Sequence, residues 1–173
     1  ALRAALRVVP GGYRVLVLAP TTILANQLYV SFVTRLDPYA VNVDIISRFR
    51  SKKIIENVKK KILESKNDIL VGTHSILNDD IYMKNIGLLI VDEEHRFGVK
   101  HKEKIKCFKE GVDVLSMSAT PIPRSLNMAL FGIYSISLLQ TPPLMRLPII
   151  TRVDYFEDSL IRDAISFEIG RGG

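Results

Sequence analysis

The sequence predicts an α/β fold in which helices cover both faces of a doubly wound, mostly parallel β-sheet. Short apolar runs alternate with longer segments of helical period, as expected for parallel strands joined by crossover helices. Most of these runs are apolar throughout, which is typical of strands buried on both faces. A chain of 173 residues with 47% hydrophobic residues can bury one sizeable core, so we expect a single domain.

Six short runs rich in Val, Ile and Leu are expected to form the strands. Each is too short for a typical helix and is bounded by polar or turn-forming residues. In chain order they span residues 15–19, 43–47, 68–72, 87–92, 113–118 and 134–139.

The helices are expected to begin near residues with capping preferences. Thr22 and Ser51 suit the N-cap position, and Pro121 or Pro123 suits a first helical turn. A further helix is expected to end near residue 9. The predicted helices span residues 22–36, 51–65, 98–109, 121–130 and 158–169.

The domain is expected to cover residues 1–140, followed over residues 141–173 by a linker that begins the connection to a second domain. Residues 141–148 contain three prolines, which disfavour regular structure. A single cysteine excludes an internal disulfide framework and indicates a reducing cytosol. No apolar run approaches the roughly 20 residues that cross a bilayer. We therefore expect a cytoplasmic protein with no membrane segment.

The charge balance is compatible with a polyanionic partner. Lys and Arg number 24 against 18 Asp and Glu, which gives a net charge of +6. The positive charge gathers in residues 48–66 and 96–109. For each segment, a solvated helix face is favoured over a dedicated binding stripe.

Polar residues follow four of the predicted strands where each strand ends. Ligands of open parallel sheets gather at the carboxyl ends of the strands, because the loops and helix N-termini meet there. The polar segments are residues 20–22, 72–74, 92–95 and 118–120.

Asp92 and Glu93 are the strongest candidates for chemistry. Nucleotide hydrolysis needs one carboxylate to hold magnesium and another to activate water. Consecutive strand residues point to opposite sides, so Asp92 can face a metal while Glu93 reaches the attacking water. The alternative for this pair is a charged loop that caps a helix.

Two spaced motifs resemble those of superfamily-two helicases. The acidic box from Asp92 to His95, followed by Ser118-Ala119-Thr120, resembles motifs two and three of that superfamily. Residues 19–22 with Gln27 resemble its motif Ia, and residues 72–74 resemble motif Ib. The resemblance implies a RecA-like motor domain that uses ATP and Mg²⁺.

Within this superfamily, residues 46–51, 91–102 and 119–127 resemble the transcription-repair coupling factors. That resemblance implies part of an ATP-dependent double-stranded-DNA translocase of the bacterial cytoplasm, which displaces stalled RNA polymerase in transcription-coupled repair of DNA damage. RNA polymerase and nucleotide-excision-repair proteins would bind through regions outside this chain.

The resemblance also implies residue roles. Asp92 would hold Mg²⁺ through water, and Glu93 would polarise the hydrolytic water. His95 would sense nucleotide state, with backbone capping as its alternative, and Ser118, Ala119 and Thr120 would couple hydrolysis to movement. Ordinary surface salt bridges remain the alternative for the two arginines among the residues expected to contact DNA phosphates. Those residues are Thr21, Thr22, Arg48, Arg50, Gly72, Thr73 and His74. By contrast, His101 is expected to be solvated and Cys107 to be a small core residue.

A phosphate-binding loop of the form G-x-x-x-x-G-K-[ST] does not occur in the chain. The resemblance implies that this loop precedes Ala1, so we expect a RecA-like domain truncated at its N-terminus. The chain alone would then be inactive as an ATPase, with an unpaired sheet edge beside residues 113–118. Three alternatives stay open: a branched-DNA helicase that remodels replication forks, a non-catalytic DNA- or partner-binding remnant of a motor domain, and a flavodoxin-like or nucleotide-sugar domain.

Overall fold

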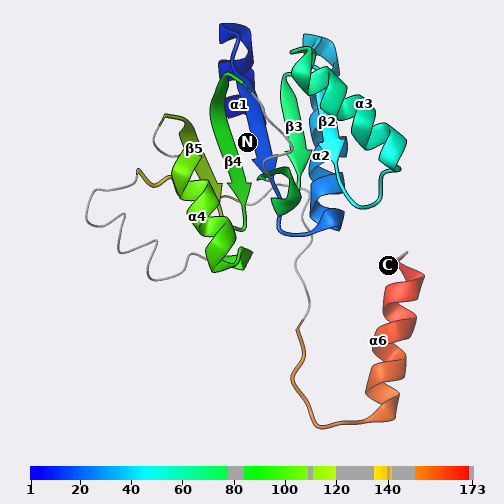
Figure 1. Cartoon of the computed structure of the whole chain (residues 1–173). Helices are drawn as coiled ribbons and strands as arrows, with labels where there is room; N and C mark the ends of the chain where they lie inside the picture. The colour runs from blue at the N-terminus through cyan, green and yellow to red at the C-terminus, as the bar shows by residue number, and fades with distance from the viewer. Residues whose placement is uncertain (78–83, 109–110, 120–134, 140, 142–150, 172–173) are drawn as a thin grey trace. The chain divides into compact units, whose positions relative to one another are not determined.

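The computed structural model of the chain is shown in Figure 1. It describes residues 1–77, 84–108, 111–119, 135–139, 141 and 151–171. The chain divides into two units, Ala1–Tyr134 and Ser135–Gly173, which are treated separately below.

The first unit is built on a five-stranded sheet in which every pair of neighbouring strands is parallel. The strand order β2-β3-β1-β4-β5 places the first strand of the chain at the centre of the sheet. Within the described residues, β5 is bonded to β4 alone and forms one edge. The strands are β1 (Arg14–Leu18), β2 (Val43–Ile46), β3 (Ile69–Gly72), β4 (Ile86–Asp92) and β5 (Asp113–Met117).

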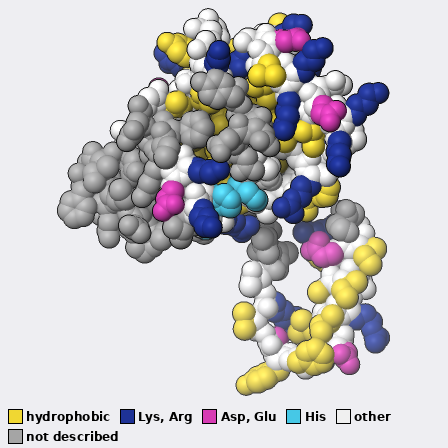
Figure 2. All heavy atoms as spheres, in the orientation of Figure 1, with side chains coloured by type: hydrophobic (Ala, Val, Ile, Leu, Met, Phe, Trp, Pro, Cys, Tyr) yellow, Lys and Arg dark blue, Asp and Glu magenta, His cyan; other side chains and the backbone are white. Residues whose placement is uncertain are grey.

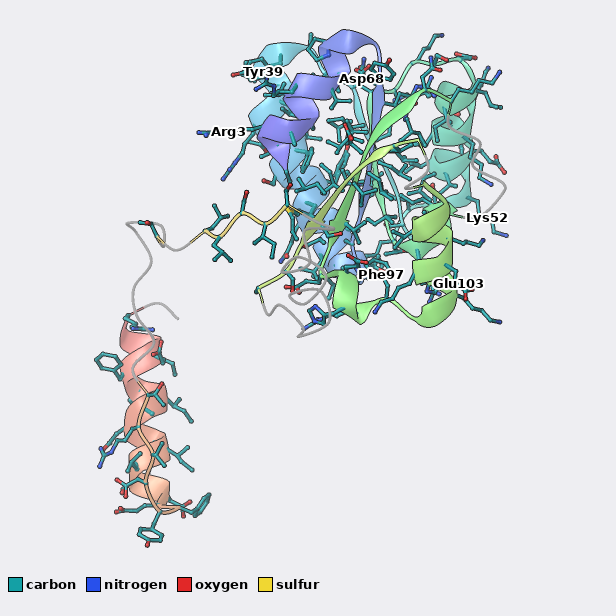
Figure 3. The ribbon with its side chains drawn as sticks, turned by 90° about the vertical axis from the view of Figure 1, so that its left-hand side faces the viewer. Arg3, Tyr39, Lys52, Asp68, Phe97 and Glu103 are labelled. Carbon is teal, nitrogen blue, oxygen red and sulfur yellow. The ribbon has the colours of Figure 1, made fainter. Side chains whose placement is uncertain are left out.

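Helices cover both faces of this sheet, as Figures 1 and 3 show. On one face lie α1 (Leu2–Val8) and α2 (Thr22–Leu36), and on the other lie α3 (Lys52–Leu63) and α4 (Val99–Phe108). The connections that the structure describes contain four short 3₁₀ helices. These are η1 (Val9–Gly11), η2 (Asp37–Tyr39), η3 (His74–Leu77) and η4 (Glu94–Arg96).

The central strand β1 explains why the sequence shows continuous apolar runs. Leu16 and Leu18 belong to the core cluster on the α3 and α4 face, whereas Val15 and Val17 belong to the cluster on the α1 and α2 face. All five residues of β1 are buried. A strand covered on both sides has no solvent-facing positions, so it shows no alternation of polar and apolar residues. The predicted α/β fold is confirmed.

The helix caps agree with the sequence at one position and differ by one residue at another. The Ser51 hydroxyl accepts a hydrogen bond from Ile54 N over 3.4 Å, as expected of an N-cap. For α2 the cap is Thr21 rather than Thr22, since Thr21 Oγ1 accepts from Leu24 N over 3.3 Å. The backbone of Thr21 is extended, with φ −129° and ψ 155°, whereas Thr22 is already helical. An N-cap keeps a non-helical backbone, so the prediction of Thr22 was wrong by one position.

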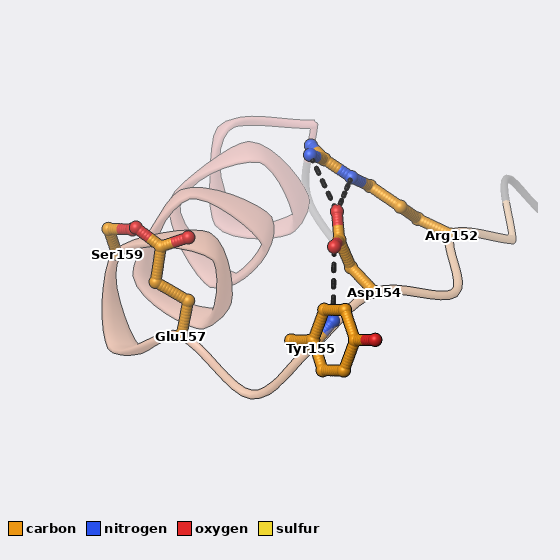
Figure 4. A network of polar contacts seen from close by, with 5 residues as sticks. All are labelled: Arg152, Asp154, Tyr155, Glu157 and Ser159. Carbon is orange, nitrogen blue, oxygen red and sulfur yellow. Dashed lines mark hydrogen bonds and ion pairs between the residues drawn. The ribbon is translucent and has the colours of Figure 1, made fainter.

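In its described residues the second unit has one helix, α6 (Asp158–Gly170), close to the predicted residues 158–169. Before it, Arg152 donates to Asp154 Oδ2 from Nη2 over 3.0 Å, and Tyr155 N donates to Asp154 Oδ1 over 3.0 Å (Figure 4). Ser159 Oγ donates to Glu157 Oε1 over 2.6 Å. These contacts join near neighbours in the sequence, so they order the entry to α6 locally.

The strand predicted over residues 134–139 is not present in its described part. Ser135 to Leu139 form no regular structure, and all five residues are exposed. An apolar run forms a strand only where a neighbouring strand accepts its hydrogen bonds, and these residues pair with none. The helix predicted at 121–130 and most of the proline-rich segment 141–148 fall outside the described residues. Among the helices that are described, none combines the length and the apolar character that a membrane crossing requires.

Candidate functional site

The residues that follow β1, β3, β4 and β5 meet at one edge of the sheet. This follows from the parallel register, in which Leu18 lies beside both Gly72 and Val91, and Asp92 lies beside Met117. In Figure 3, Phe97, which follows β4, and Asp68, which precedes β3, lie at opposite ends of the sheet. The polar segments predicted from the sequence therefore do gather at the carboxyl edge.

Asp92 is the last residue of β4 and is half-buried. Burial raises the pKa of its carboxyl group, and the nearby Glu93 carboxylate raises it further, while a backbone hydrogen bond with Glu93 acts in the opposite direction. Both causes of the rise disfavour an unaccompanied negative charge. A bound cation would offset both of them.

The donors at this edge fit Mg²⁺ better than a transition metal. Asp92 and Glu93 offer hard carboxylate oxygens, and the described residues contain no cluster of three or more His, Cys, Asp or Glu side chains that could enclose a metal. Mg²⁺ is usually held by one or two carboxylates together with water and substrate phosphates. A magnesium ion bound through Asp92 is consistent with this donor set.

Glu93 lies just beyond the strand and adopts a left-handed backbone conformation, with φ 50° and ψ 51°. Its N–H donates to Met117 O over 2.8 Å, so the hydrogen bonding between β4 and β5 extends one residue beyond the end of β4. The direction of its side chain is therefore set by this turn. The expectation that strand alternation separates Glu93 from Asp92 was wrong in its cause, since only Asp92 belongs to the strand.

The Glu93 carboxylate meets His95 and Ser118. The Ser118 hydroxyl donates to Glu93 Oε2 over 3.2 Å. His95 Nδ1 lies 3.2 Å from the same oxygen and 3.3 Å from Ser118 Oγ. One side chain from the end of β5 is thus joined to two that follow β4. The described contacts of the His95 ring are with side chains and do not support the backbone-capping alternative.

Two members of the predicted coupling segment are described. Ser118 takes part in the cluster above, and Ala119 is exposed. Thr120 lies outside the described residues.

The residues predicted to contact DNA differ in how accessible they are. Thr21 is exposed and Thr22 is half-buried, whereas Thr73 is buried with its Oγ1 3.1 Å from Ser75 Oγ. Gly72 is required by packing, because a Cβ there would lie 2.5 Å from Ile76 Cγ2 and 2.7 Å from Ile46 O.

The two arginines after β2 occupy different surroundings. Arg48 is exposed, whereas the Arg50 guanidinium lies 5.4 Å from the centre of the Tyr29 ring on α2. Such a cation–π contact orients the guanidinium without neutralising it. Within the described ranges, neither arginine forms an ion pair.

His74 contacts a residue that was not expected to belong to the site. Its ring centroid lies 4.3 Å from that of His101 on α4, with 38° between the ring planes. The expectation that His101 is simply solvated was therefore wrong. The two residues are far apart in the sequence, and no local pattern indicates their contact. The prediction for Cys107 concerns a side chain outside the described part.

A family model described as DEAD/DEAH box helicase matches residues 1–129, well over half of the chain. The chain belongs to the DEAD/DEAH box helicase family. This membership agrees with the RecA-like expectation and rules out the flavodoxin-like and nucleotide-sugar alternatives. The helicase-type motor domain is thus established together with its α/β fold.

Within the DEAD/DEAH box helicases, the chain is similar to transcription-repair-coupling factors. The chain is 49% identical over all 173 residues to the transcription-repair-coupling factor of Escherichia coli (strain K12) and 46% identical to that of Bacillus subtilis (strain 168). It spans 15% of the length of each of these relatives. Among solved structures, the chain is similar to RecG bound to a three-way DNA junction, with a TM-score of 0.73 and 30% identity. The match covers 99% of this chain and 23% of the RecG chain.

Proposed function

We propose that this chain is part of an ATP-dependent double-stranded-DNA translocase that displaces stalled RNA polymerase in transcription-coupled DNA repair. The observation that carries the proposal is the contact of Glu93 with His95 and Ser118 beside Asp92 at the carboxyl edge. The 46–49% identity to transcription-repair-coupling factors supports the choice within the family.

In this proposal Asp92 and Glu93 divide the hydrolytic work. Mg²⁺, when bound, would neutralise charge on the phosphates of ATP. Asp92 would hold the ion through water, and the ion would offset the burial and the Glu93 charge that raise the pKa of the Asp92 carboxyl group. Glu93 would orient the attacking water and accept its proton. The left-handed turn supports this role because it directs Glu93 independently of Asp92.

His95 and Ser118 would report the state of Glu93 to the β5 side of the domain. Both lie within 3.3 Å of Glu93 or of each other, so a movement of the carboxylate toward water must alter their contacts. Ser118 begins the segment that continues through Ala119 and Thr120. A change at Glu93 can therefore reach a loop at the same edge as the proposed DNA contacts.

Duplex DNA would bind across this edge through its phosphates. The proposed contacts are Arg48, Arg50 and the residues that follow β1 and β3, from Thr21 to Thr22 and from Gly72 to His74. Phosphate contacts fix position without reading base sequence, as a translocase requires. The net charge of +6 supports a polyanionic track.

The remaining parts of the activity are proposed to lie in other segments. The phosphate-binding loop motif is not found in these 173 residues, so we propose that the chain by itself does not hydrolyse ATP. RNA polymerase and nucleotide-excision-repair proteins would be bound by segments outside it. The proposed location is the bacterial cytoplasm.

A branched-DNA helicase is the second candidate, because RecG bound to a three-way DNA junction has the same fold at 30% identity. We rank the branched-DNA helicase second because the chain is more similar to the coupling factors, at 46–49% identity. Residues 46–51 also favour the coupling factors, since they resemble the corresponding segment of that family.

A chimaera tests the proposal. This chain would replace the matching 173 residues of the E. coli relative, and release of a stalled RNA polymerase from linear duplex would be measured with ATP. We expect release by the chimaera and none by its Glu93→Gln variant. A chimaera that hydrolyses ATP and unwinds branched DNA, yet leaves the polymerase in place, would instead support the branched-DNA helicase.

A further inference from the structure

The contact between His74 and His101 is fixed by the core beneath it. His74 begins η3 and His101 lies on α4, so their rings are brought together by the packing of two separate elements. Ile76 of η3 and Ile105 of α4 belong to the same buried cluster. Lys104 Nζ also donates to Leu77 O over 3.4 Å, which joins the two elements again at the surface. The pairing is therefore part of the fold.

Among the residues that the structure describes, the charged groups that act on His74 are all cationic. Arg48, from the turn after β2, and His101 are the charged neighbours that act on His74, and α4 adds Lys104 to the same junction. Burial is the largest cause that lowers the pKa of His74, followed by the charges of His101 and Arg48. No carboxylate among the described residues offsets them at His74. An imidazole in such surroundings becomes protonated more readily when an anion arrives.

The pair is accessible from outside. Both residues are half-buried, and Figure 2 shows histidine side chains at the surface with Lys and Arg side chains close by. The site directly follows Thr73 at the carboxyl edge, where DNA phosphates are proposed to bind. An anion of that edge would thus reach the rings without rearrangement of the core.

We propose that His74 and His101, together with Arg48, form a proton-dependent contact for a backbone phosphate of duplex DNA. This inference rests on the proposed DNA binding and adds His101 to it. A protonated imidazole carries N–H donors on both nitrogens, and charge-assisted hydrogen bonds to phosphate are stronger than neutral ones. The two rings lie close together, so a positive charge on His101 disfavours protonation of His74 until phosphate binds. DNA binding accordingly takes up protons, and affinity rises as the pH falls.

The test measures duplex affinity of the full chain by fluorescence anisotropy at constant ionic strength, with a dye that does not titrate. We expect the Kd of the wild-type chain to fall several-fold from pH 8 to pH 6, toward the limit of about 10-fold that one pKa unit on one group produces. His101→Gln should bind within about twofold of wild type at pH 8 and show a smaller fall in Kd between pH 8 and pH 6, because His74 is then the one ring left at the contact.

Lys100→Gln is the matched control, since Lys100 is exposed on the same helix. It removes a charge that is present at every pH in this range. Its Kd should rise by the same factor at pH 6 and pH 8. If His101→Gln keeps the full pH dependence of the wild-type chain, the proposal is overturned while DNA binding stands.

A second readout does not depend on a variant. The chain contains three histidines, so their ring C–H resonances can be followed individually by NMR during a pH titration. Duplex DNA should raise the pKa of His74 and change the ring resonances of His101. An equal rise with inorganic phosphate at the same phosphate concentration would overturn the assignment to duplex DNA. Absence of DNA binding at every pH would overturn both this inference and the proposed DNA contact.

Discussion

Ser118 Oγ lies 3.2 Å from Glu93 Oε2, although the two residues are 25 positions apart. The register of the sheet explains the contact. Asp92 at the end of β4 is beside Met117 at the end of β5. The residue that follows each strand, Glu93 or Ser118, therefore lies at the same edge of the sheet. The link between the acidic box and the following serine is therefore a direct product of two parallel strands that end together.

Glu93→Gln is expected to abolish most hydrolysis. The amide keeps the size of the side chain but cannot accept a proton from the attacking water. In the chimaera with the E. coli relative, we expect the steady-state rate of phosphate release to fall about 100-fold or more. Glu94→Gln is the control because its carboxylate makes no described contact, and it should stay within about twofold of the parent. Equal losses in both variants would contradict the assignment of Glu93.

Ser118→Ala is expected to separate hydrolysis from movement. The change removes one donor to Glu93 and one contact of His95, but it leaves both carboxylates in place. ATP hydrolysis by the chimaera should fall less than tenfold, while polymerase release per ATP should fall by a larger factor, since one hydrogen bond is worth about 1 kcal/mol. Both rates are measured on the same preparation. A variant that loses both in proportion would show that Ser118 supports hydrolysis alone.

Gly72→Ala is expected to destabilise the domain. The new Cβ would lie 2.5 Å from Ile76 Cγ2 and 2.7 Å from Ile46 O, and the carbonyl belongs to a buried strand that cannot move far. We expect the free energy of unfolding to drop by about 1–3 kcal/mol, measured by urea denaturation. Gly111→Ala, where nothing lies within 4 Å of the added atom, should change it by less than about 0.5 kcal/mol.

The lowered pKa of His74 predicts a loss of stability in acid. The unfolded chain takes up this proton near the ordinary histidine value of 6.5, whereas the folded chain takes it up only at lower pH. Stability is therefore retained above that value and falls as the pH drops through it toward the folded pKa. Urea unfolding of wild type and His74→Gln at pH 7.5 and pH 5.5 measures the effect. Between pH 7.5 and pH 5.5, His74→Gln should lose less stability than wild type. His101→Gln should lie between the two, because it removes one of the smaller causes of the lowered pKa of His74.

Much of the fold could be predicted because burial leaves a direct mark on sequence. Continuous apolar runs placed β1 and β4 within one residue of their ends. The same signal failed at residues 135–139, since composition does not reveal whether a partner strand is present.

The candidate site was predictable where spacing alone carries the information. Spacing placed Glu93, His95 and Ser118 in neighbouring loops, and the strand register then joins them. The left-handed turn at Glu93 and the stacking of His101 on His74 depend on long-range packing, which leaves no local pattern in the sequence.

The backbone of Glu93 limits how this domain could be made more robust. A left-handed conformation costs an ordinary L-residue about 1 kcal/mol, whereas glycine adopts it freely. Glycine or asparagine is thus the substitution that a stability-guided search would favour here, and either one removes the carboxylate. Under the proposed role of Glu93, a substitution here that raises thermal stability would therefore lower the rate of ATP hydrolysis.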